Sequence, residues 1–80
     1  MADRQEIFAK IVPIITEQLE IESAKIKLSS RLIDDLSADS LDAVEIVMGI
    51  EEKFNIEIPD AEIDKIKTVE DIVQYLATKV

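Results

Sequence analysis

Apolar residues recur at helical spacing in three stretches of the chain, and the first of these covers residues 3–19. Apolar side chains three and four residues apart share one face of an α-helix, so this stretch is predicted to be helical. Pro13 lies inside it. Because proline lacks a backbone N–H and crowds the preceding turn, a kink or a broken hydrogen-bond ladder is expected near residues 9–12.

Two further helices are predicted, each with a capping signal at its start. The pattern of residues 39–54 is helical, and Asp39 is a good N-cap, with Asp42 three residues later in a variant of the capping box. The last helix is expected to open with a second box at Thr68 and to end near Thr78. Both boxes supply acceptors for backbone N–H groups that have no partner at a helix start.

A long loop, residues 20–38, separates the first two helices. A loop of this length needs apolar anchors, which are Ile21, Ile26, Leu28, Leu32, Ile33 and Leu36. Residues 60–65 are expected to form one or two short helical turns, and the case for any strand is weak. The predicted fold is all-α, a bundle of three main helices and one short helix, and residues 1–80 are expected to form a single domain.

Acidic residues dominate the charge and are concentrated in the middle of the chain. The sequence has 18 acidic and 9 basic residues, a formal charge of −9, and residues 34–64 hold eleven acids against Lys53 alone. Such a field disfavours nucleic acid and anionic lipid and favours a basic protein surface as partner. The longest apolar run, residues 11–15, is too short to span a bilayer, and the first residues lack a signal-peptide pattern. A cytoplasmic protein without membrane insertion is expected.

Histidine and cysteine are both absent. Their absence removes the commonest general base, the commonest metal ligand and thiol catalysis, so an enzyme acting alone is not expected. Asp35, Ser37 and Asp39 have the spacing of the first ligands in a calcium loop. However, Ser40 stands where that loop needs glycine, and Ile46 stands where it needs its last acid. No specific metal site is predicted.

Ser40 is the candidate functional residue. If Asp39 caps the second helix, the Ser40 hydroxyl lies exposed beside free backbone N–H groups, in a field that favours a phosphate ester. The plainer interpretation is an ordinary serine at a helix start. The sequence offers no histidine, and the nearest lysine, Lys53, is more than three turns away, so nothing activates the hydroxyl as a nucleophile. We interpret Ser40 as an acceptor that another protein modifies.

The second helix is predicted to carry two apolar stripes. One, from Ala43 to Phe54, belongs to the core. The other runs down from Ser40 and is flanked by acids; its apolar members are Leu41, Val44 and Met48, and the acids are Asp42, Glu45 and Glu52. An apolar strip with a carboxylate rim is typical of a docking surface for a basic partner. Cover by the first helix or by the loop is the alternative, and both remain open.

The residues around Ser40 resemble the prosthetic-group attachment motif of acyl carrier proteins. The triplet Asp-Ser-Leu at 39–41 is a weak signal alone, but the ordered series around it is specific. This series comprises DDLSADSLDAVEIVM (34–48), EEKF (51–54), EIPD (57–60), TVED (68–71) and Tyr75. About residues 11–78 resemble the family.

The resemblance implies a four-helix bundle with a short third helix, whose interior opens to shelter an acyl chain. It implies that Ser40 carries 4′-phosphopantetheine, donated from coenzyme A by a magnesium-dependent transferase. The thiol of this arm would hold the growing chain as a thioester for the separate enzymes of fatty acid synthesis. Residues at positions that meet basic patches on the carrier-protein synthase and these enzymes are Asp39, Leu41, Asp42, Val44, Glu45, Met48, Glu51 and Glu52. Residues near the short helix that contact partners or the acyl chain are Ile58, Asp60 and Ile66. A monomer is expected.

Three residues depart from the family pattern. Ser37 stands where glycine is usual, and if that position needs a positive φ, serine is strained there. Pro13 falls where the first helix usually continues, and Gly49 replaces the more usual alanine. None of these changes removes Ser40 or the acids, so they bear on the shape of the first helix and the turn.

The sequence leaves two alternatives open. Carriers of D-alanyl, polyketide or peptidyl groups share the attachment motif, although the free-standing length and strong acidity favour the fatty acid type. An unmodified acidic adaptor, or a protein that binds divalent ions loosely through its carboxylates, would have the same charge pattern.

Overall fold

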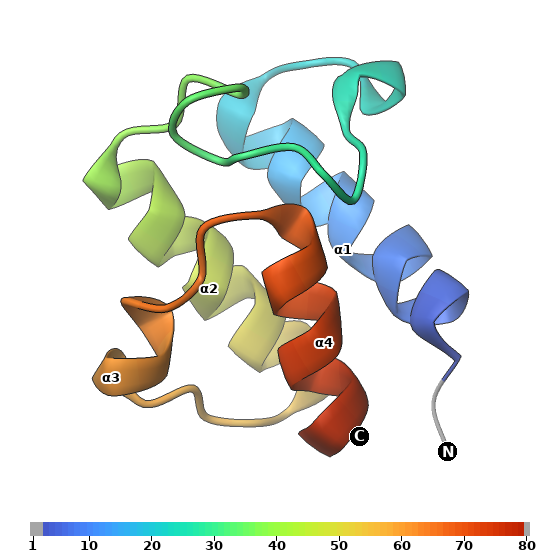
Figure 1. Ribbon diagram of the computed structural model, residues 1–80, viewed down its shortest axis with the longest axis vertical. Coiled ribbons are helices and arrows are strands. Elements are labelled where there is room, and N and C mark those ends of the chain that lie inside the picture. Colours follow the sequence, from blue (N-terminus) through green and yellow to red (C-terminus); the bar gives the residue numbers. More distant parts are fainter. Residues whose placement is uncertain (1–2, 80) are drawn as a thin grey trace.

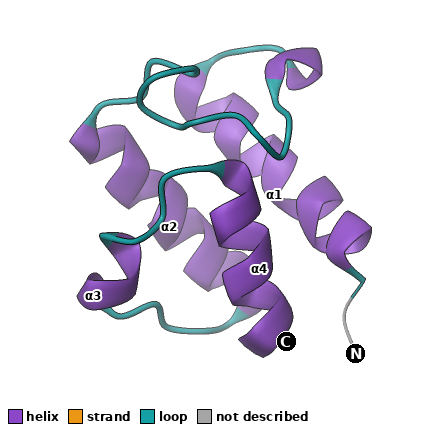
Figure 2. Ribbon diagram, viewed as in Figure 1, coloured by secondary structure: helices purple, strands orange, loops and turns teal. Residues whose placement is uncertain are grey.

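The structure is a computed structural model that describes residues 3–79, and the three long helices of this part form a bundle (Figure 1). Its helices in chain order are α1 (Arg4–Leu19), the short 3-10 helix η1 (Ser23–Lys25), α2 (Ser40–Phe54), α3 (Asp60–Ile63) and α4 (Val69–Lys79). Figure 2 shows helices and loops over these residues and no strand. The predicted all-α bundle with a short third helix is confirmed.

Side-chain caps fix the starts of α1 and α2. At α1, the Asp3 carboxylate accepts a hydrogen bond from the Gln5 N–H at 2.9 Å. At α2, the Asp39 carboxylate accepts from the Asp42 N–H at 2.7 Å, and the Asp42 carboxylate accepts from the Asp39 N–H at 3.2 Å. The predicted capping box is therefore confirmed, and α2 begins within one residue of its expected start.

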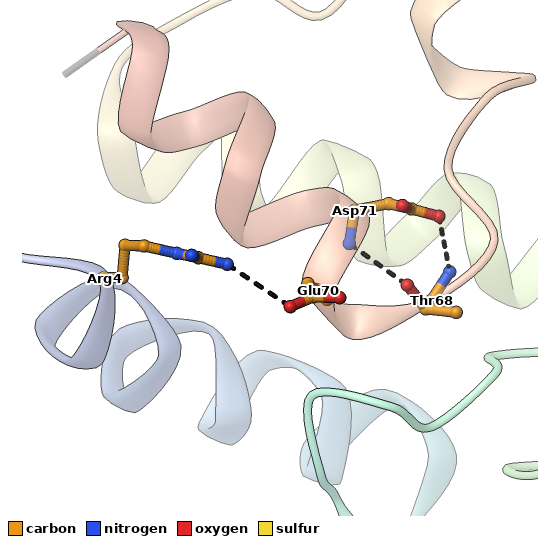
Figure 3. Close-up of polar contacts among 4 residues, drawn as sticks. All are labelled: Arg4, Thr68, Glu70 and Asp71. Atoms are coloured by element: carbon orange, nitrogen blue, oxygen red, sulfur yellow. Dashed lines mark hydrogen bonds and ion pairs between the residues drawn. The ribbon is translucent and has the colours of Figure 1, made fainter.

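A second box fixes the start of α4 (Figure 3). The Thr68 hydroxyl accepts from the Asp71 N–H at 3.1 Å, and the Asp71 carboxylate accepts from the Thr68 and Lys67 N–H groups at 3.0 and 2.9 Å. Burial alone raises the pKa of Asp71, but hydrogen bonds with Lys67 and Thr68 outweigh it and hold that pKa below the ordinary aspartate value. An exposed ion pair between Arg4 and Glu70, 3.4 Å long, joins α1 to α4 beside the box (Figure 3).

The core is built almost wholly from aliphatic side chains, and α1 packs against both α2 and α4. Each long helix buries residues at helical spacing, as its sequence pattern predicts. The buried residues of the helices are Ile7, Ile11 and Ile15 in α1, Ile46, Val47 and Ile50 in α2, and Val69, Ile72, Val73 and Leu76 in α4.

The loop between α1 and α2 is tied to the start of α4, and in Figure 1 it closes the end of the bundle where α4 begins. The Val69 N–H donates to the Ser30 carbonyl at 3.0 Å, and the Glu70 N–H donates to the Leu28 carbonyl at 2.9 Å. These bonds use backbone donors that a helix start leaves free, so the loop acts as a backbone cap on α4.

The prediction that six apolar residues anchor this loop is correct in part. Ile26, Leu32 and Leu36 are buried in the core, and Ile21 packs against it while partly buried. Leu28 and Ile33 are instead among the exposed large hydrophobic residues, so they do not anchor the loop. Backbone hydrogen bonds to the start of α4 also fix the loop, and the apolar pattern of the sequence does not reveal them.

Pro13 does not interrupt α1, which continues from Arg4 to Leu19. Proline can donate no backbone hydrogen bond, so the carbonyl of Ala9 loses its usual helical partner. Pro13 and Ala9 are both exposed, so water can donate a hydrogen bond to the Ala9 carbonyl instead. The predicted gap in the hydrogen-bond ladder thus falls on the solvent face, where it does not end the helix.

Gly49 lies where α2 packs tightly against Ile14 of α1. A Cβ atom at Gly49 would lie 2.9 Å from Cγ2 of Ile14, closer than packed carbon atoms come. Gly49, Pro13 and Ile14 also line the same groove between the two helices. Two of the departures from the family pattern are therefore neighbours in the fold, and glycine allows α1 to lie against α2 here.

Gly49→Ala is expected to lower the free energy of unfolding by about 1 kcal/mol, although alanine is the better helix former. Its methyl group collides with Ile14, whose β-branched side chain cannot easily turn away. With Ile14→Ala in the background the collision is absent, and the same change is expected to raise the free energy of unfolding by about 1 kcal/mol. Denaturant melts of the four proteins measure both effects. The same sign in both backgrounds would contradict this contact.

Candidate functional site

The site centres on Ser40, the first residue of α2, whose side chain is exposed. The capping box on either side fixes its backbone, because Asp39 and Asp42 each bind the other's N–H group. Ala38, two residues before Ser40, is buried in the core. The chain thus leaves the core at Ala38 and presents the Ser40 hydroxyl to solvent.

The turn before Ser40 depends on Ser37, which has a φ of 60°. This is the left-handed region that favours glycine, so the predicted strain at Ser37 is confirmed. The turn is closed by a hydrogen bond of 2.9 Å from the Ala38 N–H to the Leu32 carbonyl. Buried Leu36 and Ala38 therefore hold Ser37 in a conformation that serine does not prefer.

Ser37→Gly is expected to raise the free energy of unfolding by about 1 kcal/mol, because glycine has no Cβ to clash at positive φ. For a domain of this size, that corresponds to a melting temperature about 4–8 °C higher. Ser29→Gly is the matched control, since Ser29 lies in a turn without a positive φ and glycine there only adds freedom to the unfolded chain. A thermal melt in which both variants shift alike would contradict the strain at Ser37.

A pocket of about 410 Å³ opens beside Ser40. Its apolar wall comes from the loop before α2, from α2 itself, and from α3 and the segment after it; the residues are Leu32, Ile33, Ala43, Val44, Ile63 and Ile66. Its charged lining residues are Arg31, Asp34, Asp64 and Lys67. A modification on Ser40 would therefore have an apolar recess beside it.

The second apolar strip of α2 is exposed, so the alternative that a neighbour covers it is wrong, and its role as a docking surface stays a prediction. Leu41 and Met48 keep 65% and 60% of their surface accessible, and Val44 is also exposed. Neither α1 nor the loop covers the strip. Glu45 and Glu52 are exposed on the same helix, so the apolar strip has the acidic flank that the sequence predicts.

Gln18 of α1 is a neighbour of this strip that the sequence did not identify. Its side-chain amide donates to the Asp42 carboxylate at 3.2 Å and also to the Glu45 carboxylate. The polar Gln18 lies in an apolar helix pattern and gives no distinctive signal. This contact joins the acidic edge of α2 to α1.

The other predicted partner residues lie in different surroundings. Glu51 is half-buried and accepts a hydrogen bond of 2.7 Å from the Ile58 N–H, so its carboxylate holds the chain between α2 and α3. Ile58 is only 4% exposed and belongs to the core, which does not suit contact with a partner surface. Asp60 is exposed at the start of α3, and Ile66 is half-buried at the pocket beside Ser40. Their functional roles remain predictions.

The carboxylates with calcium-loop spacing serve the local backbone. Asp35 accepts a hydrogen bond from the Arg31 N–H at 2.8 Å, and Asp39 caps α2. Within residues 3–79, no three side chains of the usual ligand types come together as a metal site. In the same part of the chain, no helix has the length and apolar character needed to cross a membrane.

The family described as "Phosphopantetheine attachment site" matches residues 9–76. The chain is also similar to proteins named acyl carrier protein: 52% identical over 71 residues in Helicobacter hepaticus, 53% over 72 in Wolinella succinogenes, and 47% over 79 in Thermotoga maritima. These alignments cover 89%, 90% and 99% of this chain and 93%, 95% and 98% of the relatives.

The chain therefore belongs to the acyl carrier protein family. Its prosthetic group is covalently attached 4′-phosphopantetheine, and proteins of this family are carriers without a catalytic activity of their own. The exposed serine at the start of a helix fits such a group, because it offers a free hydroxyl with space beside it.

Proposed function

We propose that this protein is a cytoplasmic carrier that holds acyl intermediates on an arm attached to Ser40 and presents them to the separate enzymes of fatty acid synthesis. The observation that carries the proposal is the exposed Ser40 hydroxyl, fixed by a capping box at the mouth of an apolar pocket. The family supports a carrier role and leaves the position of attachment to this geometry.

Attachment requires a partner enzyme. The Ser40 oxygen forms a bond to the pantetheine-side phosphorus of coenzyme A, and the bond from that phosphorus to 3′,5′-ADP breaks. The proton of the hydroxyl must pass to a base on the transferase, because this chain has no histidine. When attached, the group supplies a thiol, which the chain lacks because it has no cysteine.

The pocket beside Ser40 favours an aliphatic cargo. Its wall of Ile33, Val44, Ile63 and Ile66 offers apolar surface to an acyl chain. Burial of the chain against this surface is favourable because it removes apolar area from water. A D-alanyl group is too small to cover this wall, and its charged amine gains nothing from the apolar part of it. This difference supports a fatty acyl cargo over a D-alanyl one, while the polyketide and peptidyl classes are disfavoured only by the strong acidity and free-standing length of the chain.

The exposed strip of α2 is the proposed docking surface. Leu41, Val44 and Met48 offer apolar contact, and acids beside them offer charge to basic patches on the synthase and on the enzymes of fatty acid synthesis. The protein is proposed to work as a monomer, since each partner needs access to this strip and to Ser40.

Incubation of the purified protein with coenzyme A, magnesium and a carrier-protein synthase tests the proposal. Intact-mass spectrometry is expected to show one phosphopantetheinyl addition per chain, and a second incubation with a fatty acid and an acyl-carrier ligase is expected to add one acyl group. An unchanged mass after the first step would overturn the carrier role. Transfer of D-alanine, but of no fatty acid, would overturn the cargo class.

A further inference from the structure

Two basic residues line the pocket beside Ser40, within an otherwise acidic neighbourhood. Arg31 and Lys67 share this pocket with Ser40, although residues 34–64 hold eleven acids and Asp39 and Asp42 flank the serine directly. Arg31 and Lys67 lie just outside that acidic segment, on either side of it in the chain. The fold alone brings them together, and the apolar and capping patterns of the sequence do not single them out.

Hydrogen bonds hold the backbones of these two residues side by side. Arg31 forms an isolated antiparallel bridge with Thr68, and the Leu32 N–H donates to the Lys67 carbonyl at 3.1 Å. The N–H of Lys67 is itself bound by the Asp71 carboxylate at 2.9 Å, as part of the cap on α4. The two side chains therefore start from fixed points on the pocket wall.

The charged ends of both side chains remain available. The guanidinium of Arg31 lies 3.6 Å from the Asp34 carboxylate, but these side chains are 65% and 70% exposed, and an ion pair so exposed is weak. The ammonium of Lys67 makes no ion pair with any residue in the range 3–79. Asp64 lines the pocket as well, so the pocket offers two cationic donors without a net positive charge.

We infer that Arg31 and Lys67 together bind an anionic group carried on Ser40, either the phosphodiester of the arm or a carboxylate at the end of a dicarboxylic acyl cargo. This inference rests on the proposed attachment at Ser40. A phosphodiester there adds a negative charge beside Asp39 and Asp42; the start of α2 offsets part of this repulsion, and nearby cations would offset more of it. Arginine and lysine are the side chains that bind phosphate and carboxylate oxygens best, and two of them acting on one anion bind it more strongly than either alone.

The test compares the modified protein with Arg31→Gln/Lys67→Gln. Its control is Lys25→Gln/Lys27→Gln, which removes the same charge from exposed positions that do not line the pocket. The first readout is the melting temperature of the modified protein minus that of the unmodified protein. This difference is expected to fall by about 4 °C or more in the pocket variant and to stay at the wild-type value in the control. The second readout is the ³¹P NMR shift of the phosphodiester.

Three forms of the modified protein separate the two sources of negative charge: the arm with its free thiol, the acetyl thioester and the malonyl thioester. The melting-temperature difference is measured for each form. If the pocket variant lowers this melting-temperature difference equally in all three forms and changes the ³¹P shift, the bound anion is the phosphodiester. If the melting-temperature difference is lowered in the malonyl form alone, the bound anion is the carboxylate of the cargo. The charge-preserving variant Arg31→Lys/Lys67→Arg is expected to behave as wild type in either case.

A pocket variant that matches the control in every form would overturn the inference. Mass spectrometry of each sample keeps this failure distinct from failure of the proposed function. If the wild-type protein accepts no arm, attachment at Ser40 is wrong; if it accepts the arm and the variants melt alike, only the role of Arg31 and Lys67 is wrong.

Discussion

Ser40→Ala is expected to abolish the phosphopantetheinyl mass gain completely, because it removes the oxygen that forms the new bond. The fold is expected to survive the change. Ser40 is exposed, and the hydrogen bonds that cap α2 come from Asp39 and Asp42 and not from Ser40. Its melting temperature should stay near that of the wild type, since exposed substitutions away from such contacts change stability by about 0.5 kcal/mol or less.

Ser37→Ala is the matched control for this experiment. Ser37 is also exposed and lies three residues before Ser40, but it belongs to the turn and not to the helix start. It is expected to accept the arm as the wild type does, although alanine at positive φ gains no relief from strain. A full mass gain on Ser40→Ala would place the attachment on another residue. Loss of the mass gain in both Ser40→Ala and Ser37→Ala would mean that attachment depends on the shape of the turn and would not identify the Ser40 hydroxyl as the acceptor.

The parts of the fold that the sequence predicts best are those determined by residues close together in the chain. The capping boxes at Asp39 and Thr68 involve partners three residues apart, so their spacing alone indicates the helix starts. The first box places Ser40 at the start of α2, but the box alone does not expose its side chain, because Val69 has the same position after the second box and is buried. The position of the candidate residue was therefore accessible to sequence reasoning before any fold was known, and its exposure was not.

Contacts between distant segments could not be predicted in this way. The fit of Gly49 against Ile14 depends on how closely α1 approaches α2, and the chain separates the two residues by a whole loop. The pairing of Arg31 with the segment before α4 is equally distant, and so is the hydrogen bond from Gln18 to Asp42. Periodicity reports which face of a helix is apolar but does not report which neighbour meets it.

Exposure of the Leu41–Met48 strip lies between these cases. The helical pattern places the strip on α2, yet only the packing decides whether a neighbour covers it. The neighbours of α2 are occupied elsewhere: α1 lies along the acidic edge, where Gln18 meets Asp42 and Glu45, and the loop is bonded to α4. The strip is left free as a consequence, and the charge beside it can then be tested directly.

Glu45→Lys/Glu52→Lys is expected to lower kcat/KM for attachment of the arm by about tenfold or more at about 0.1 M salt, while Ser40 itself is unchanged. Both acids are exposed beside the strip. If they meet a basic patch on the synthase, reversing them replaces attraction by repulsion, and steering of this kind changes association rates by about 10–10³-fold. Initial rates from mass spectrometry, over a range of synthase concentrations, measure the effect.

Glu6→Lys/Glu22→Lys makes the same change in net charge elsewhere, in the first turn of α1 and directly before η1. These elements lie across the molecule from the start of α2 (Figure 1). Since exposed charges farther apart than about 8–10 Å are largely screened at physiological salt, this control is expected to react within about twofold of the wild type. Added salt should bring the two double variants together. Equal losses in both at every salt concentration would mean that partners sense the overall charge of the protein and not the strip on α2.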